Sequence, residues 1–400
     1  MPEDAKTIVL FEPVCVDGEH APFNAGLIAS ALEVAPSAVF AAEPGHVCAV
    51  RDLMSGTDGA RVQWRDIGVP PRHQYALHER FPIEWRNVRE IARMADETRA
   101  RAIVASSATS ATLVAARIRA RLGTRRPFGI VFHSLLDQFV RSRRGRVMLR
   151  WGNSTQIRLV VLGERLRQDV VAAIPELDST LRAITHPYVF TEAPRSSSQV
   201  EPSRLTFAFI GNATLSKGFD DFLSLAEQTA NCDSQFELIG QLREDCSPLQ
   251  ARLKKQIEAG RFVSTAANER LATGQYRARL SAISYAVFPY RRLDYQYVAS
   301  GAALDALWAA KPLIALRIPV FEELFDRLGD VGHLCTDLDH MRAVVNELSE
   351  NPQPARYRAQ SDALIRGRRL FEPRAVGEEL RIALGLAANS ATRGPDGTLS

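Results

Sequence analysis

Lysine is almost absent from this sequence of 400 residues. Of its 50 basic residues, five are lysines and the other 45 are arginines; the lysines are Lys6, Lys217, Lys254, Lys255 and Lys311. The net charge of +4 is a mild excess. No strongly basic domain or nucleic-acid-binding signature accompanies it, so we expect no nucleic-acid partner.

Cysteine and long apolar segments are scarce as well. The five cysteines are scattered and include no Cys-x-x-Cys pair, a spacing that fits neither a disulfide framework nor a zinc site. The first residues include acids and no long apolar region, unlike a secretory signal. The uncharged run at 102–116 is too short to span a bilayer. We therefore expect a protein of the reducing cytoplasm.

What the sequence does contain is an alternation of short apolar runs with helical patterns. The apolar runs fall at 7–11, 37–42, 101–105, 128–132 and 157–163, and again at 205–211, 235–240, 261–264, 284–290 and 312–316. Strands that alternate with helices in this way form βαβ units with a parallel sheet. Because the chain is too long for one ordinary core, we predict an α/β protein with two Rossmann-like domains in tandem. Ligands are expected in an inter-domain cleft, at the carboxyl ends of strands.

A polar segment divides the two halves. Residues 191–204 contain two prolines and a run of serines, which predicts a linker. We therefore expect an acceptor-side domain at 1–190 and a donor-binding domain at 205–370. A last amphipathic helix is expected at 371–387, in a position to pack back on the N-terminal domain, and a disordered tail at 388–400.

The rare Lys217 follows one of the predicted strands. The stretch FAFIGNATLSKGFDDFL predicts a strand that ends at Ile210, a turn at Gly211 and a helix that begins close to Lys217 and Gly218. A helix N-terminus presents unpaired N–H groups and a positive dipole end, and a lysine there adds a full charge. This combination suits a diphosphate, although the spacings of the P-loop and of the dinucleotide fingerprint are absent. The alternative is an ordinary connection with an exposed lysine.

A second strand-end loop lies within 286–316. Ser300 and Gly301 open a predicted helix there, and Asp305 lies one turn further, on the same face as Gly301. The first two residues suit phosphate recognition through N–H groups, and Asp305 suits hydrogen bonds from a ribose diol. A serine N-cap and an acid favoured by the helix dipole explain the same residues without a ligand.

Together the two loops resemble the donor domain of nucleotide-sugar glycosyltransferases with the GT-B fold, in particular the retaining family 4. The strand, glycine, five residues, lysine, glycine and helix of that family are matched by Gly211, Lys217 and Gly218. Two acidic positions further along the family pattern correspond to Tyr297 and Asp305, so that Tyr297 replaces a glutamate.

The resemblance covers about 205–335 and implies a donor site there. The residues that it implies for binding a nucleotide-diphosphate sugar are Gly211, Asn212, Lys217, Gly218, Tyr297, Ser300, Gly301 and Asp305. Asn212 stands where the family often has an arginine, and Arg291 or Arg292 is a candidate replacement for that contact. The nucleotide sugar is expected as a co-substrate, with no cofactor and no metal.

Two histidines are candidates for the chemistry. His133 follows the strand at 128–132 and resembles the family histidine near the anomeric carbon of the donor, which implies retention of configuration. His20 lies in a segment that resembles the GH-x-x-P opening of inverting GT-B enzymes, whose histidine removes the acceptor proton. Asp17 and Glu19 beside it are candidates for orienting the imidazole and binding the acceptor. Because the donor motifs are the stronger evidence, we predict retention, with either histidine in an inactive surface loop as the alternative.

The segment from Arg141 to Arg158 carries six arginines. It suits an anionic membrane or an acidic acceptor, so we include peripheral contact with the inner membrane face among the predictions. The alternative is a solvated helix face in an arginine-rich protein.

The function implied is a glycosyltransferase of the hexosyltransferase type. It would transfer a sugar from a nucleotide-diphosphate sugar to a glycan, a lipid-linked acceptor or a small molecule, in polysaccharide biosynthesis. Two alternatives share the architecture: a nucleotide-sugar 2-epimerase, which needs no acceptor, and a catalytically silent nucleotide-sugar-binding subunit. The changes at Asn212 and Tyr297 keep the last alternative open.

Overall fold

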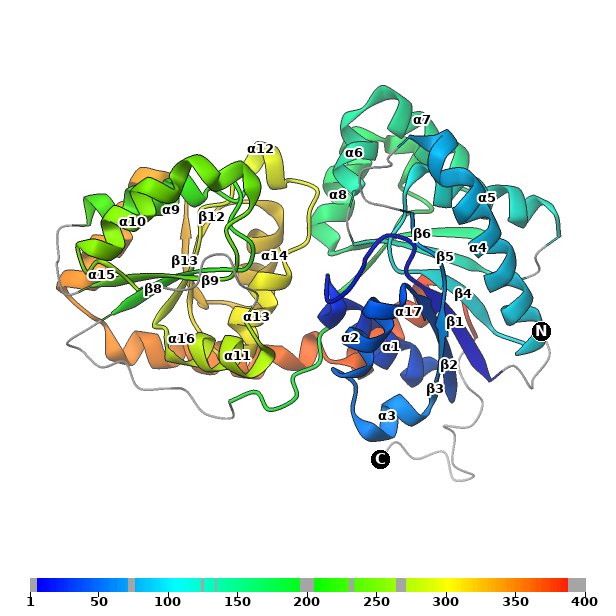
Figure 1. The fold of residues 1–400 in the computed structure, drawn as a ribbon, viewed down its shortest axis with the longest axis horizontal. Coiled ribbons are helices and arrows are strands. Elements are labelled where there is room, and N and C mark those ends of the chain that lie inside the picture. Colours follow the sequence, from blue (N-terminus) through cyan, green and yellow to red (C-terminus); the bar gives the residue numbers. More distant parts are fainter. Residues whose placement is uncertain are drawn as a thin grey trace. The chain divides into compact units, whose positions relative to one another are not determined.

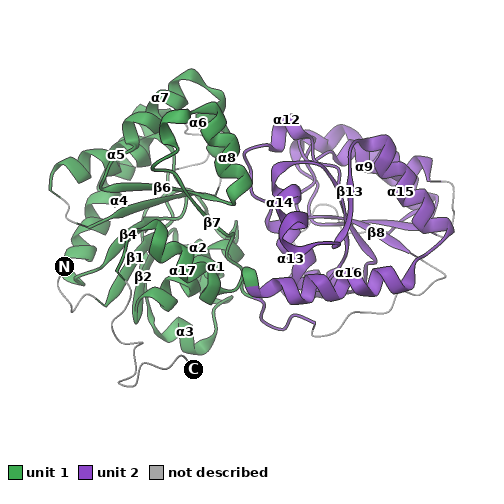
Figure 2. Ribbon diagram, turned by 180° about the vertical axis from the view of Figure 1, so that it is seen from behind, with its two compact units in different colours: residues 1–189, 370–400 green, residues 190–369 purple. Residues whose placement is uncertain are grey.

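The computed structural model describes residues 6–70, 76–123, 126–133, 135–194, 205–229, 234–263 and 271–387. The chain forms two compact units (Figure 2): unit 1 comprises residues 1–189 and 370–400, and unit 2 comprises residues 190–369. Residues 195–204 of the predicted linker and the tail predicted at 388–400 lie outside the described residues.

Unit 1 is built on a sheet of seven parallel strands, in the order β3-β2-β1-β4-β5-β6-β7. The strands are β1 (Thr7–Phe11), β2 (Ser37–Ala42), β3 (Val62–Asp66), β4 (Ala102–Ala105), β5 (Phe128–Phe132), β6 (Ile157–Leu162) and β7 (Arg182–Ile184). The central strands β1, β4 and β5 are buried along their whole length. Continuous apolar runs are typical of parallel strands with helices on both faces.

The helices of unit 1 connect these strands. They are α1 (Ala21–Val34), α2 (Pro44–Arg51), α3 (Gly56–Ala60), α4 (Leu77–Glu97), α5 (Ser110–Arg121), α6 (Leu136–Arg141), α7 (Arg143–Gly152), α8 (Glu164–Ala173) and α17 (Pro373–Ala383). Helix α5 packs on both α4 and α7, whereas α1 packs on α17 (Figure 1).

Helix α17 brings the far end of the described chain into unit 1. At Gly377 the missing side chain permits close approach to α1, because a Cβ there would lie 2.7 Å from the carbonyl oxygen of Ser30. The Glu379 carboxylate accepts a hydrogen bond from Thr185 Oγ1 at 3.0 Å, just after β7. Residues 370–387 therefore complete the packing of the first sheet.

Unit 2 has a sheet of six parallel strands, in the order β10-β9-β8-β11-β12-β13. The strands are β8 (Thr206–Ile210), β9 (Gln235–Ile239), β10 (Phe262–Val263), β11 (Tyr285–Phe288), β12 (Leu313–Leu316) and β13 (Gly332–Cys335). Its helices are α9 (Phe219–Gln228), α10 (Gln250–Glu258), α11 (Thr273–Ala282), α12 (Arg292–Tyr295), α13 (Gly301–Ala309), α14 (Pro319–Leu328), α15 (Leu338–Glu350) and α16 (Pro354–Gly367).

Each sheet reverses its strand order at one point, between β1 and β4 in unit 1 and between β8 and β11 in unit 2. Ligands of open parallel sheets bind outside the carboxyl ends of the strands at such points. The prediction of two Rossmann-like α/β domains is confirmed. The loops after β1, β8 and β11, which hold most of the predicted site residues, lie at the two reversal points.

Candidate functional site

The loop after β8 begins with a tight glycine turn. Gly211 has φ +89°, a region that glycine adopts without strain. Gly240 follows the neighbouring strand β9, and a Cβ on it would lie 2.0 Å from the carbonyl oxygen of Gly211. The backbone after β8 can therefore pass this close to β9 only because position 240 has no side chain.

Lys217 folds back over this turn. Its Nζ lies 3.7 Å from the position that a Cβ on Gly211 would occupy and 5.6 Å from the ring centroid of Tyr290. Burial lowers the pKa of Lys217 to about 8, and the nearby carboxylate of Asp305 opposes that shift. A half-buried ammonium group next to a bare backbone turn is a strong site for an anion.

Gly218 lies where the loop after β8 contacts the end of β11, the two strands of the reversal point. It is the N-cap residue of α9, with φ +70°, and a Cβ there would lie 2.0 Å from the carbonyl oxygen of Pro289. The end of β11 therefore packs directly against the start of α9, which fixes the position of Lys217 relative to the second loop.

The second loop supplies the start of α13. Ser300 caps this helix, its Oγ accepting a hydrogen bond from the N–H of Ala303 at 3.3 Å. Gly301 is exposed, with open space where its side chain would be. Asp305 is half-buried and accepts a hydrogen bond from the Tyr276 hydroxyl at 2.7 Å.

The two loops meet at Ala302, whose Cβ lies 3.6 Å from the position that a Cβ on Gly211 would occupy. The structure thus brings the glycine turn, Lys217 and the start of α13 into one site. Asn212 is exposed beside the turn, and Tyr297 is half-buried in the segment before α13. These two positions depart from the family pattern.

Arg291 forms ion pairs with two carboxylates of unit 2. Its guanidinium pairs with Asp220 at 2.5 Å and with Asp221 at 3.3 Å, both in the first turn of α9. Burial raises the pKa of Asp221, and the neighbouring charge of Asp220 raises it further. Arg291 neutralises this acidic turn, which would otherwise repel an anion at the N-terminus of α9.

In unit 1 a buried carboxylate marks the reversal point. Glu12 directly follows β1 and is fully buried. It accepts hydrogen bonds from the N–H groups of Val14 and Cys15 at 2.8 and 3.1 Å, from Ser106 Oγ at 2.9 Å and from Ser107 Oγ. Several donors are what a buried carboxylate requires. These bonds tie the loop after β1 to the residues after β4.

His46 on α2 extends this network to the loop that carries His20. The Asn24 amide donates to His46 Nε2 at 2.9 Å and lies 3.3 Å from the Glu12 carboxylate. His46 Nδ1 donates to the carbonyl oxygen of Asp17 at 2.7 Å, so this ring nitrogen carries a proton. Asp17 and His20 have φ of 49° and 50°, uncommon for residues other than glycine. The network therefore holds an unusual loop conformation in place.

The two histidines predicted as alternatives lie in contact. The ring centroids of His20 and His133 are 4.2 Å apart, edge to face, and Phe23 stacks on His133 at 4.2 Å. A third imidazole, His186, meets the edge of Phe23 at 5.1 Å. Residues that follow three strands of unit 1 thus lie together: Phe23 contacts His133 and His186, and His133 contacts His20.

Burial governs the ionisation of His133 and His186. His133 is buried, and its Nδ1 has no hydrogen-bond partner among the described residues. Burial lowers the pKa of His133 well below its usual value, and the nearby His20 and His186 lower it further. Burial also lowers the pKa of His186 to about 4. Both rings are therefore neutral near pH 7, while His20 is exposed.

The predicted acceptor-side residues share the loop of His20. Asp17 is exposed, and its N–H donates to the Glu43 carboxylate at 3.1 Å; Glu19 is half-buried. Sequence reasoning missed Glu12 and His186. Glu12 follows a predicted strand directly, and this signal was sufficient to find it.

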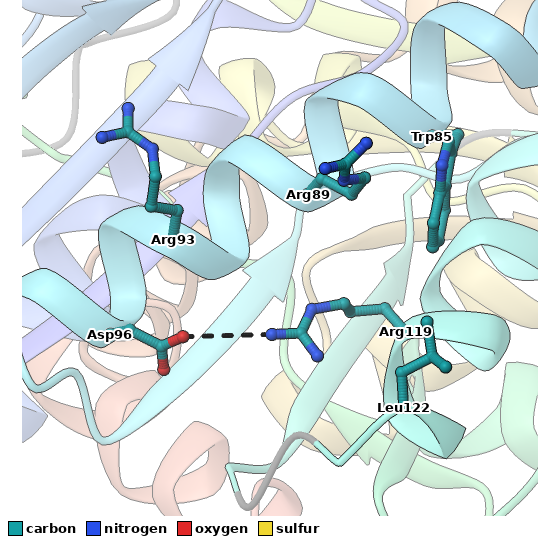
Figure 3. Close-up of a pocket in the computed structure, with 6 residues that line it drawn as sticks. All are labelled: Trp85, Arg89, Arg93, Asp96, Arg119 and Leu122. Atoms are coloured by element: carbon teal, nitrogen blue, oxygen red, sulfur yellow. Dashed lines mark ion pairs between the residues drawn. The ribbon is translucent and has the colours of Figure 1, made fainter.

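A surface pocket of about 280 Å³ lies elsewhere in unit 1 (Figure 3). Its lining residues are Trp85, Arg89, Arg93, Asp96, Arg119 and Leu122, with Arg119 3.9 Å from Asp96. They belong to α4, to α5 and to the residue after α5. The ends of α4 and α5 that contribute to it lead into β4 and β5, so the pocket lies at the amino edge of the sheet, opposite the predicted site.

Two absences among the described residues bear on this site. No group of three or more His, Cys, Asp or Glu side chains in them is placed to hold a metal ion. Within the same ranges, no helix is both long enough and apolar enough to cross a membrane.

The sequence matches no family model and no curated protein. Solved structures do match. Anabaena Alr3699/HepE, in complex with UDP, aligns with a TM-score of 0.69 at 14% identity, over 95% of this chain and 99% of that chain. The E. coli trehalose-6-phosphate structure bound with UDP-2-fluoro glucose aligns with a TM-score of 0.66 at 10% identity, over 95% of this chain and 99% of that chain. A glycosyltransferase from Rickettsia africae aligns at 0.66 and 11%, over 95% and 98%.

This chain has the GT-B fold. The likeness spans almost the whole of each chain, and it confirms the resemblance predicted from the two loops of unit 2. Identities this low establish the fold and leave the activity to be argued from the site itself.

Proposed function

We propose that this protein is a glycosyltransferase that uses a nucleoside-diphosphate sugar as donor. The observation that carries the proposal is the placement of Lys217 Nζ beside the Gly211 turn, at the reversal point of the second sheet. A charge in that position stabilises a diphosphate when bound and as it departs. Neighbouring N–H groups at the start of α13 and the carboxylate of Asp305 suit the phosphates and the ribose hydroxyls.

The structural neighbours indicate which nucleotide to test first. Anabaena Alr3699/HepE was solved with UDP and glucose, and the E. coli structure with UDP-2-fluoro glucose. A uridine diphosphate sugar is therefore the first donor to test. Asn212 and Tyr297 are part of the proposed donor site, together with Gly218, Ser300 and Gly301.

The histidine cluster of unit 1 is the proposed site of the acceptor chemistry. We assign His133 to the stabilisation of the donor sugar and His20, with Asp17 and Glu19, to acceptor binding, in a retaining reaction without a metal. The neutral state of His133 supports this assignment, because a neutral imidazole can donate or accept a hydrogen bond without adding charge. A glycan, a lipid-linked acceptor or a small molecule, and a cytoplasmic location with peripheral membrane contact, remain predictions.

The test is donor binding followed by substitution of the lysine. UDP and UDP-sugars should raise the melting temperature of the protein in proportion to their affinity. Lys217→Ala should weaken UDP binding about ten- to a hundredfold, because one charge-assisted contact is worth about 1.5–3 kcal/mol. Lys254→Ala is the matched control, since that lysine is exposed on α10 and pairs with Glu258.

Two outcomes would contradict the proposal. If no nucleoside diphosphate or its sugar raises the melting temperature, the donor site is absent. If Lys217→Ala leaves UDP affinity and turnover as they are in the Lys254→Ala protein, the lysine has no part in binding. Sugar isomerisation without an acceptor would instead indicate an epimerase, and binding without any turnover a silent subunit.

A further inference from the structure

The basic segment after β5 has no role in the proposed transfer reaction. No aspartate or glutamate occurs from residue 138 to residue 163. Within it, Arg143, Arg144 and Arg150 are exposed on α7. Arg158 belongs elsewhere: it lies on β6, and its guanidinium is 3.7 Å from the position that a Cβ on Gly385 would occupy. The exposed basic surface therefore includes only some of the arginines in this stretch of the sequence.

Apolar side chains accompany these arginines. Val147 and Trp151 are 54% and 37% exposed, and they lie one turn apart on α7. Leu122, directly after α5, is 66% exposed. Three of the eight exposed large apolar residues in the described part of the chain thus lie on α7 or directly after α5.

Contacts between α5 and α7 make one continuous surface of these residues. The Arg121 guanidinium lies over the Trp151 ring, 5.8 Å from its centroid. Arg117 Nε donates to the backbone carbonyl of Trp151 at 3.2 Å. Helices α5 and α7 are neighbours in both views of the fold (Figures 1 and 2). The α5–α7 surface consists of Arg121, Leu122, Arg143, Arg144, Val147, Arg150 and Trp151.

The charges of this surface are largely uncompensated. Arg150 pairs with Glu176 at 3.0 Å. Arg143 and Arg144 form no ion pair with any described residue. Positive charge that is not compensated within the fold is available to an external anionic partner.

We propose that the α5–α7 surface docks unit 1 on an anionic lipid bilayer. Arginines at a bilayer surface gain from the negative headgroups, while an indole and aliphatic side chains gain from the interface beneath them. A soluble polyanion would use the charges but would leave Trp151, Val147 and Leu122 in water. The docking goes beyond the proposed transfer reaction and does not depend on it, since it is measured without donor or acceptor.

The experiment is co-sedimentation of the full chain with lipid vesicles. Vesicles of phosphatidylcholine with about 30% phosphatidylglycerol should bind the protein, pure phosphatidylcholine vesicles should not, and added salt should release it. The triple variant Arg143→Glu, Arg144→Glu, Arg150→Glu should bind on the order of a hundredfold more weakly. Trp151→Ser should weaken binding about tenfold, because it removes apolar contact without a change of charge.

The control variant reverses charges elsewhere in the same unit. Arg51→Glu with Arg65→Glu changes two exposed arginines, one on α2 and one on β3, which is the edge strand on the other side of the first sheet from β5 and β6. It should keep most of the vesicle binding. Melting temperatures show that each variant is folded; if the triple variant is not, Trp151→Ser and the salt titration decide.

Three results would overturn the proposal. The first is equal binding to neutral and anionic vesicles, or none to either. The second is an equal loss of binding in the control variant. The third is binding to a soluble polyanion such as heparin that matches vesicle binding and is insensitive to Trp151→Ser, which would assign the surface to a soluble partner. None of these results bears on donor binding, so this proposal and the transferase proposal fail separately.

Discussion

The ammonium group of Lys217 lies in surroundings that weaken its hold on a proton. With a pKa of about 8 in the free protein, Lys217 is charged near pH 7 and increasingly neutral above pH 8. A bound diphosphate favours the charged form, so binding above pH 8 must take up a proton. UDP affinity should therefore be constant below about pH 7 and fall by up to about tenfold per pH unit above pH 8.

Titration calorimetry from about pH 7 to about pH 9 measures this fall. Lys217→Arg is the control, because a guanidinium stays charged over this range and should give the flatter profile. Ionisation of the ligand itself contributes equally to both proteins. A wild-type profile identical to that of Lys217→Arg would show that the lysine does not meet the diphosphate.

The burial of histidines in unit 1 leads to a second prediction, which concerns the pH dependence of stability. The folded-state pKa of His186 is about 4, below the 6.5 of an unperturbed imidazole, so the unfolded chain binds more protons between these values. Burial of the neutral His186 ring therefore makes the free energy of unfolding depend on pH. Stability is highest above pH 6.5 and falls as the pH falls towards 4, by up to about 3 kcal/mol. Thermal unfolding between about pH 7.5 and pH 5 should show a decline that His186→Gln reduces. An equal decline in the variant would mean that other groups cause it.

At the scale of elements, the ends of strands could be predicted from the sequence, whereas contacts between distant segments could not. An apolar run followed by Gly211 predicted the end of β8, and an apolar run predicted the end of β11 to within two residues, because both signals are local. The hydrogen bond from Tyr276 to Asp305 and the edge-to-face contact of His186 with Phe23 join segments far apart in the chain. Nothing local marks such pairs, so sequence reasoning could not find them.

The packing of α17 on α1 gives a prediction at the same scale. Gly377→Ala should lower the melting temperature of unit 1, because the new Cβ would lie 2.7 Å from Ser30 O. Overpacking typically costs about 1–3 kcal/mol, against a gain of up to about 1 kcal/mol in helix propensity. Gly59→Ala in α3 is the matched control, with its nearest neighbour at 3.9 Å. Stability unchanged or raised in both variants would show that α1 and α17 adjust freely.

At the scale of the whole molecule, the sequence predicted two similar sheets in series and a last helix, at 371–387, in a position to pack back on the N-terminal domain. The residues after 369 belong to unit 1, although they follow unit 2 in the chain. Amphipathicity predicts that a helix packs on something, and only the tertiary contacts identify the partner. The residues proposed for the donor and for the acceptor chemistry divide between the units: Lys217 lies in unit 2 and the histidine cluster lies in unit 1.

The stereochemistry of the product tests the roles proposed for the two histidines. If His133 serves the donor sugar in a retaining reaction, the product keeps the anomeric configuration of the donor. His133→Ala should then be severely impaired, while His20→Ala should mainly raise KM for the acceptor. If His20 is a general base, the product is inverted and His20→Ala loses about two to four decades in rate. Because the two rings are only 4.2 Å apart, loss of activity alone cannot distinguish these roles. The anomeric proton in an NMR spectrum of the product can, and an inverted linkage would transfer the chemistry to His20.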